Sequence, residues 1–484
     1  MTPENAAHEN AAPENTAIKN TSLRKALQTD ADALAACVGA GKVLFGGDIS
    51  EDYSHDELSG VFSAPDILVR AANTDDICAV MRYATQENIA VVARGSGTGL
   101  VGGAVAVEGG ILLETTAMNE ILELDEKNMC VTVQPGVLLM ELAAFCESRG
   151  YFYPPDPGEK TATIGGNIAT NAGGMRAVKY GVTRDYVLGL ELALPNGEVI
   201  DVGGKTVKNS SGYSLKDLII GSEGTLAIVT KAILKLLPLP TASVSMLVPF
   251  EAFDVAIEAV PKLISGKHGF TALEFMERET ITYAEEYLGK KFPDTRHPAY
   301  LLLTIDGNSE EVVKRAYSDA AEACLSYGAV DVYLVDTEER KTAVWNARGA
   351  FLEAIKASAG EIDECDVVVP RSGVADFIKS SHELAKQMGL RLPSFGHAGD
   401  GNLHIYLCRD GLPEEAFAAH CTRVFDILYE KAAMMGGQVS GEHGVGYAKR
   451  EYLQRQHGEP YMALLRGIKN VFDPQGILNP HKIV

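Results

Sequence analysis

Three glycine-rich segments, at residues 93–105, 154–185 and 221–230, constrain this chain more than any other feature. They read ARGSGTGLVGGAV, PPDPGEKTATIGGNIATNAGGMRAVKYGVTRD and GSEGTLAIVT. Ordering a glycine costs more conformational entropy than ordering any other residue, so glycines repeated in this way indicate that a ligand approaches the backbone closely. A single glycine-rich loop can equally be a surface turn. Three such segments in one half of the chain favour a large, extended cofactor.

The first segment contains the dinucleotide-binding pattern GxGxxG at Gly97, Gly99 and Gly102. In a Rossmann fold this loop opens a helix directly after a strand. Here it continues into GGAVAVEGG, which is a poor helix former. The segment instead favours a tight loop whose consecutive backbone N–H groups point at a pyrophosphate.

Two short segments of the second half, FGHAGDGNLHIYL and SGEHGVG, concentrate the chemically active side chains. They contain His397, His404, Glu442 and His443. Two imidazoles and a carboxylate suit a divalent transition metal such as Fe, Zn or Mn, with open positions for a substrate. Any one of these histidines alone would more often be structural. Their grouping in glycine-flanked loops favours a functional site.

Composition limits the class of protein. A chain of 484 residues exceeds one hydrophobic core, so we expect two domains. The net charge of −22 argues against nucleic-acid binding, and no apolar run is long enough for a transmembrane segment. The eight cysteines form no CxxC pair, which argues against a zinc ribbon, an iron–sulfur cluster or a disulfide framework. We expect a cytoplasmic protein, or one held at a membrane periphery through a partner.

Hydrophobic periodicity predicts a mixed α+β chain. Apolar residues recur at helical spacing in residues 23–38, and strand and helix patterns then alternate up to about residue 240. Beyond residue 240, strands and helices alternate again, and the end of the chain is mostly helical.

Together these motifs carry a family resemblance. RGSGTGLVGG, TIGGNIATNAGG with a following YG, and GSEGTLAIVTKAILKL resemble the FAD-binding domain of the vanillyl-alcohol oxidase/PCMH-type flavoproteins. GHAGDGNLH, SGEHGVG and VFDPQGILNP resemble the FAD-linked oxidase C-terminal domain. Members of this family include the glycolate oxidase D subunit, D-lactate dehydrogenases and D-2-hydroxyglutarate dehydrogenase.

The resemblance implies an α+β fold: a PCMH-type FAD-binding domain of two subdomains, followed by an α+β substrate (cap) domain with a helical C-terminal segment. We therefore expect a disordered tail at 1–20, an N-terminal helical arm at 21–60, the FAD-binding domain at 61–240 and the substrate and metal domain at 241–484. The last roughly 40 residues would return to the FAD-binding domain.

The resemblance also implies the residues that hold FAD. The pyrophosphate would be wrapped by Arg94, Gly95, Ser96, Gly97, Thr98, Gly99 and Leu100. The isoalloxazine ring and ribityl chain would be lined by Pro155, Thr163, Ile164, Gly165, Gly166, Asn167, Ala172, Gly173 and Gly174. The adenine and ribose end would be completed by Gly181, Glu223, Gly224 and Ile228. Between Gly150 and Cys324 the only histidines are His268 and His297, both in the second domain, so we expect non-covalent FAD.

In the second domain, the resemblance implies that His397, His404 and Glu442 bind the metal and that His443 is the catalytic base. Asn402 would lie near the substrate or the flavin. Arg348 would pair with the substrate carboxylate, and a surface salt bridge is the alternative for this residue.

The substrate preference rests on one departure from the family pattern. Members that oxidise hydroxyglutarate carry a lysine where this chain reads GEIDECDVVVPRS. Acidic residues at 361–366 would repel a second carboxylate, which favours D-lactate or glycolate over D-2-hydroxyglutarate.

The resulting hypothesis is hydride transfer from C2 of a 2-hydroxy acid to flavin N5, with metal assistance. The chain contains no cluster to accept electrons, so the resemblance favours an electron-transfer flavoprotein or an iron–sulfur subunit as partner, with oxygen or a quinone as alternatives. Two hypotheses of another class remain open, a metallohydrolase and a non-catalytic flavin-binding subunit.

Overall fold

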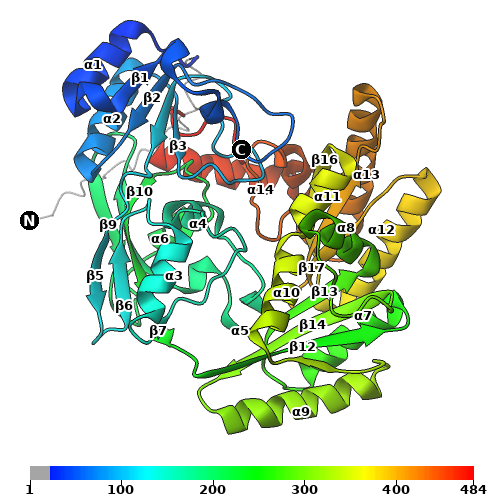
Figure 1. The fold of residues 1–484 in the computed structure, drawn as a ribbon. Helices are drawn as coiled ribbons and strands as arrows, with labels where there is room; N and C mark the ends of the chain where they lie inside the picture. The colour runs from blue at the N-terminus through cyan, green and yellow to red at the C-terminus, as the bar shows by residue number, and fades with distance from the viewer. Residues whose placement is uncertain (1–21) are drawn as a thin grey trace, which may run out of the picture.

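The computed structural model describes residues 22–484, and its chain runs through three main sheets with helices around them (Figure 1). The tail predicted at 1–20 lies outside the described residues. Among those described, no helix combines the length and the apolar character needed to cross a membrane.

The first sheet lies near the N-terminus and has the strand order β1-β2-β4-β3. Its strands are β1 (Val43–Phe45), β2 (Ile67–Arg70), β4 (Ile111–Glu114) and β3 (Val91–Arg94), and the last three are parallel. Helices α1 (Gln28–Val38) and α2 (Thr74–Glu87) pack against it through Leu34, Ile77 and Met81, which are fully buried. No helix joins β3 to β4, as the rejection of a Rossmann loop predicts.

The second sheet is antiparallel and has the order β5-β6-β10-β8-β9. Its strands are β5 (Ile121–Asp125), β6 (Cys130–Val133), β10 (Ile228–Lys235), β8 (Val187–Ala193) and β9 (Val199–Gly203). Beside it lie α3 (Leu139–Glu147), α4 (Ile164–Thr170), α5 (Ala177–Tyr180) and α6 (Leu215–Ile219), and the strands β7 (Tyr151–Phe152) and β11 (Leu237–Pro238) form a separate pair.

Helix α4 forms inside the second glycine-rich segment. Thr163 caps it by accepting the N–H of Gly166 at 3.2 Å. Ile164 and Ile168 are fully buried in the core of the second sheet, and this packing offsets the low helix propensity of the glycines.

The third sheet has the order β15-β12-β14-β13-β17-β18-β16 and is antiparallel. Its strands are β15 (Tyr333–Val335), β12 (Ala242–Phe250), β14 (Ala299–Gly307), β13 (Phe270–Glu277), β17 (Ser394–His397), β18 (Asn402–Cys408) and β16 (Ile362–Val368). One face packs on α7 (Phe253–Ser265), α9 (Glu310–Ser326), α12 (Val374–Met388) and α13 (Glu414–Met434). The other packs on α8 (Arg278–Leu288), α10 (Glu338–Gly349) and α11 (Phe351–Ala359).

The last helix, α14 (Arg450–Phe472), leads the chain back to the first sheet (Figure 1). After it, Leu478 forms a parallel bridge with Val91, and Asn479 donates a side-chain hydrogen bond to the carbonyl of Gly103 at 2.9 Å. The C-terminal segment therefore lies beside the first glycine-rich loop.

Candidate active site

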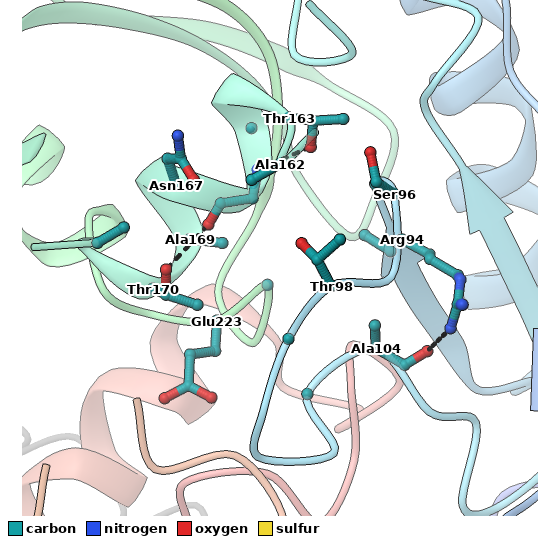
Figure 2. Close-up of a pocket in the computed structure, with 18 of the residues that line it drawn as sticks. Arg94, Ser96, Thr98, Ala104, Ala162, Thr163, Asn167, Ala169, Thr170 and Glu223 are labelled. Carbon is teal, nitrogen blue, oxygen red and sulfur yellow. Dashed lines mark hydrogen bonds between the residues drawn. The ribbon is translucent and has the colours of Figure 1, made fainter. Parts of the chain in front are cut away.

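The three glycine-rich segments meet around one cavity, which we call the first cavity. It lies between the loop after β3, the start of α4 and the turn before β10 (Figure 2). Of the residues predicted to hold a cofactor, it is lined by Arg94, Gly95, Ser96, Gly97, Thr98, Gly99, Leu100, Thr163, Gly165, Gly166, Asn167, Ala172, Gly173, Glu223, Gly224 and Ile228. Pro157, Ala162, Thr170 and Val229 also line it and were not predicted, because short apolar or hydroxyl side chains carry no distinctive pattern.

Four of the predicted residues do not line this cavity: Pro155, Ile164, Gly174 and Gly181. Ile164 is fully buried in the hydrophobic core. A Cβ at Gly174 would lie 1.9 Å from the backbone oxygen of Asp156, and one at Gly181 would lie 2.1 Å from the Asp185 carboxylate. These two glycines therefore permit close packing of the chain on itself.

The loop after β3 presents unused hydrogen-bond donors. Among the described residues, the backbone N–H groups of residues 96–100 donate no hydrogen bond. These residues are exposed or half-buried around the cavity, and a run of backbone N–H groups open to a cavity in this way fits an anionic ligand. The FAD pyrophosphate is such a ligand, and the cavity residues fit this cofactor.

Arg94 does not direct its charge at this cavity. Its guanidinium donates to the carbonyl oxygens of His55 at 2.7 Å, Asp52 at 3.1 Å and Ala104 at 3.4 Å, the last drawn in Figure 2. Because these bonds occupy the side chain, the structure supports a role for Arg94 in fastening the segment before β2 to the glycine loop. At the pyrophosphate, the backbone of Arg94 therefore remains as the group that could bind, and its side chain does not.

His397, His404 and Glu442 converge at one point. The Glu442 Oε1 lies 3.2 Å from the Nε2 of His404 and 3.5 Å from the Nε2 of His397. The second ring nitrogen of each histidine is hydrogen-bonded to a carboxylate: His397 Nδ1 to Glu274 at 2.7 Å and His404 Nδ1 to Glu364 at 2.9 Å. Carboxylates that hold one imidazole nitrogen while the other faces a common centre are typical of metal sites.

The electrostatics of this cluster also fit a cation. Burial alone would lower the pKa of both histidines, but the surrounding carboxylates outweigh it. The pKa of His397 lies well above its usual value because of Glu274 and Glu442, and that of His404 is raised to about 9 by Glu364 and Glu442. Glu442 Oε2 is buried and has no hydrogen-bond partner among the described residues. A divalent metal would both supply the positive charge and use the unpaired oxygen.

His443 lies beside this cluster and does not share its centre. Its ring stacks on that of His404 with centroids 5.1 Å apart, and its Nε2 is 3.9 Å from the Glu442 carboxylate. The loop that carries both residues is anchored by Asp366, which accepts hydrogen bonds from the backbone of His443 at 3.2 Å and from Lys449 at 3.0 Å.

Asn402 is fixed by the same carboxylate. Its Nδ2 donates to Asp366 at 2.7 Å and to the carbonyl of Val367 at 3.1 Å, and its buried Oδ1 has no partner among the described residues. The side chain therefore offers an acceptor to a ligand.

A second cavity brings Arg348 to the histidine cluster. It is lined by Arg348, Trp345, Phe395, His397, His404, Tyr406, Glu442 and His443, among others. Arg348 is 7% exposed, which excludes a surface salt bridge. Its Nε and Nη2 donate to Glu274 at 3.0 and 2.6 Å, and its guanidinium lies 4.6 Å from the centroid of the Phe395 ring.

Four residues that support the site were not predicted from the sequence, although each forms hydrogen bonds that fix a site residue or its loop: Glu274, Glu364, Asp366 and Lys449. Glu274 lies within the strand FTALEFME, where a carboxylate amid apolar residues is the one available signal.

The acidic side chains of the segment 361–366 lie outside the second cavity. Glu361 pairs with Arg409, Glu364 accepts from His404 and Asp366 pairs with Lys449. None of the acidic side chains of this segment lines the second cavity in the described part of the chain. The expected repulsion of a second substrate carboxylate therefore finds no support, because these carboxylates are paired and do not themselves line the cavity.

Comparison with known protein families gives two matches along the chain. Residues 65–203 match the model of an FAD binding domain, and residues 239–483 match that of the C-terminal domain of FAD linked oxidases.

Among individual proteins, the chain is 47% identical to a D-lactate dehydrogenase of Anaerostipes hadrus, over 91% of this chain and 94% of that protein. It is 40% identical to the glycolate oxidase subunit GlcD of Bacillus subtilis, over 89% and 91% of the two chains. A crystal structure of p-cresol methylhydroxylase with substrate bound has the same fold, with a TM-score of 0.78 at 15% identity over 94% of this chain and 96% of that one.

Proposed function

Because this chain belongs to the family of FAD-linked oxidases, we propose that it is an FAD-dependent dehydrogenase that oxidises a D-2-hydroxy acid to the 2-oxo acid. The meeting of the two cavities carries this proposal. Glu442 and His443 line both the first cavity, with its unpaired backbone donors, and the second cavity, with Arg348. A hydroxy acid held beside these two residues would therefore adjoin a flavin in the first cavity.

Three side chains would hold the divalent metal: His397, His404 and Glu442. When bound, FAD supplies an acceptor at N5 for the hydride that leaves C2, and the metal supplies Lewis acidity toward the substrate hydroxyl.

The chain's own residues orient the acid and remove its proton. Arg348 Nη1 donates no hydrogen bond among the described residues, because Glu274 occupies the other side of the guanidinium. This nitrogen would bind the substrate carboxylate. His443 would take the hydroxyl proton at Nε2 as C2 loses its hydride, which converts the hydroxyl group to the carbonyl group of the 2-oxo acid. Asn402 Oδ1 would accept a hydrogen bond from the substrate or the flavin.

We favour D-lactate or glycolate as substrate, and the similarity to D-lactate dehydrogenase and GlcD supports this choice. D-2-hydroxyglutarate is the second candidate. Basic side chains such as Lys356 and acidic ones such as Glu353 both line the second cavity, so its wall carries charges of both signs, and the acidic segment 361–366 is not part of it.

A partner protein would reoxidise the flavin. All eight cysteines are free and seven are buried, so the described chain offers no cysteine cluster for an iron–sulfur centre. An electron-transfer flavoprotein or an iron–sulfur subunit is the partner we propose.

A substrate panel tests the proposal. The purified, metal-replete protein is mixed anaerobically with D-lactate, L-lactate, glycolate and D-2-hydroxyglutarate, and visible flavin absorbance is followed. We expect D-lactate to bleach the flavin and L-lactate to leave it oxidised. A metallohydrolase would purify without flavin absorbance, and a non-catalytic flavin-binding subunit would not be bleached by any of the acids.

A further inference from the structure

Glu223 lies in the wall of the first cavity, but its carboxylate points away from Ser96, Thr98 and Asn167 (Figure 2). The residue lies in the turn before β10 and is 7% exposed. One carboxylate oxygen accepts the N–H of Val445 at 2.7 Å, and the other accepts the N–H of Gly446 at 2.7 Å. Both oxygens are thus engaged by backbone that lies more than 200 residues later in the chain.

These two amides lie two and three residues after His443 in the segment 440–448, which we call the site loop. A Cβ at Gly444 would lie 2.8 Å from Glu223 Oε1, so the loop approaches this carboxylate as closely as a glycine allows. The backbone of Glu223 is fixed as well. Its φ is +52°, its N–H donates to Ala169 at 2.8 Å, and its carbonyl accepts from Asn479 at 2.8 Å.

The opposite side of the site loop is held by the third sheet. Asp366 of β16 accepts hydrogen bonds from the backbone of Gly441 and His443 and from the Ser440 hydroxyl. The loop is therefore held at its beginning by a carboxylate of the substrate-side sheet and at its end by a carboxylate of the FAD-side turn.

We infer that Glu223 is a positioning residue through which the FAD-binding half of the chain holds Glu442 and His443 between the two cavities. It does so through its carboxylate, whose two oxygens are engaged by the backbone N–H groups of Val445 and Gly446. This differs from the place at the adenine and ribose end that the family resemblance implies. The inference rests on the proposed function only in treating Glu442 and His443 as site residues.

Hydrogen–deuterium exchange of the FAD-saturated full-length protein tests this inference without any substrate. We expect Glu223→Ala to raise amide exchange in the peptide covering the site loop by about tenfold or more, because both hydrogen bonds to the loop backbone are lost. Exchange in the third sheet and the FAD content should stay unchanged. Zinc added as a probe should bind more weakly, because Glu442 is no longer held. Glu223→Gln keeps one acceptor oxygen and should give an intermediate exchange rate.

Glu126→Gln is the matched control, because Glu126 is an exposed glutamate of the same half of the chain with no side-chain hydrogen bond among the described residues. Unchanged site-loop exchange in Glu223→Ala, or faster exchange only in molecules that have lost FAD, would overturn the inference. If Glu223→Ala does not fold, the same two measurements on Glu223→Gln decide between these outcomes. A failure of the substrate panel would leave this exchange experiment unaffected, so the two proposals fail separately.

Discussion

The carboxylate of Glu274 accepts a hydrogen bond from His397 Nδ1 at 2.7 Å and, through its other oxygen, binds Arg348 at 2.6 Å. Glu274 is fully buried, and its pKa is lowered because His397 and Arg348 outweigh the effect of burial. One charged side chain therefore orients both a proposed metal ligand and the proposed substrate arginine.

Replacing Glu274 with Gln should weaken both functions together. The amide cannot accept from both partners as a carboxylate does, so we expect metal affinity to fall by about 10- to 100-fold and KM to rise. Metal content after dialysis and steady-state KM measure the two effects. Glu277→Gln is the control, because Glu277 lies on the same strand and bonds Ser394 and His382, neither of which lines the second cavity. A change in KM with full metal retention would separate the two roles and contradict this account.

Arg348→Lys should keep the charge beside Glu274 but lose the planar guanidinium that faces the second cavity. We expect KM for the hydroxy acid to rise by about 10- to 100-fold, with a smaller change in kcat. Arg340→Lys, on the exposed side of the same helix, should leave both constants unchanged. An unchanged KM in Arg348→Lys would remove the substrate-binding role.

Metal removal should separate cofactor binding from catalysis. Of the three proposed metal ligands, Glu442 lines the first cavity and His397 and His404 do not, so dialysis against dipicolinate should leave the visible flavin absorbance intact. Flavin reduction by the hydroxy acid should stop, because the hydroxyl loses its Lewis acid. Adding back Zn²⁺ or Mn²⁺ should restore it. Full flavin reduction in protein shown to contain no metal would contradict the proposed site.

Gly166→Val should block FAD without unfolding the chain. A Cβ at Gly166 would meet one atom within 4 Å, the Thr163 Oγ1 at 3.2 Å, so a larger side chain would extend into the first cavity. We expect purified Gly166→Val to lose most of its visible flavin absorbance and to keep its secondary structure by circular dichroism. Gly41→Val is the control, since a Cβ there meets nothing within 4 Å. A fully flavinated Gly166→Val would show that the cofactor lies elsewhere.

The predicted residues that lie close together in the structure are those whose signal is local in sequence. Glycines around Gly97, Gly166 and Gly224 mark close backbone approach, and they do line one cavity. His397, His404 and Glu442 lie in two short motifs, and their ligand atoms converge. Such segments can be recognised because both the backbone requirement and the side-chain chemistry are encoded within a few residues.

The residues that sequence analysis missed depend on contacts between distant segments. Glu274 reaches His397 from 123 positions away, and Glu364 reaches His404 from 40 positions away. A lone glutamate carries no sign of its partner. The same limit explains Arg94. Its position in the glycine loop predicts a phosphate ligand, whereas in the structure its guanidinium donates to the carbonyl oxygens of Asp52 and His55.

Anaerobic stopped-flow reduction of the metal-replete, FAD-bound protein by D-lactate tests the central claim most directly, with His443→Ala measured alongside. We predict that D-lactate bleaches the wild-type flavin, that C2-deuterated D-lactate does so more slowly, and that His443→Ala keeps its FAD but reacts about 100-fold more slowly or worse. Equal rates in the wild-type protein and His443→Ala, or no bleaching of the wild-type flavin by any 2-hydroxy acid of the panel, would contradict the account.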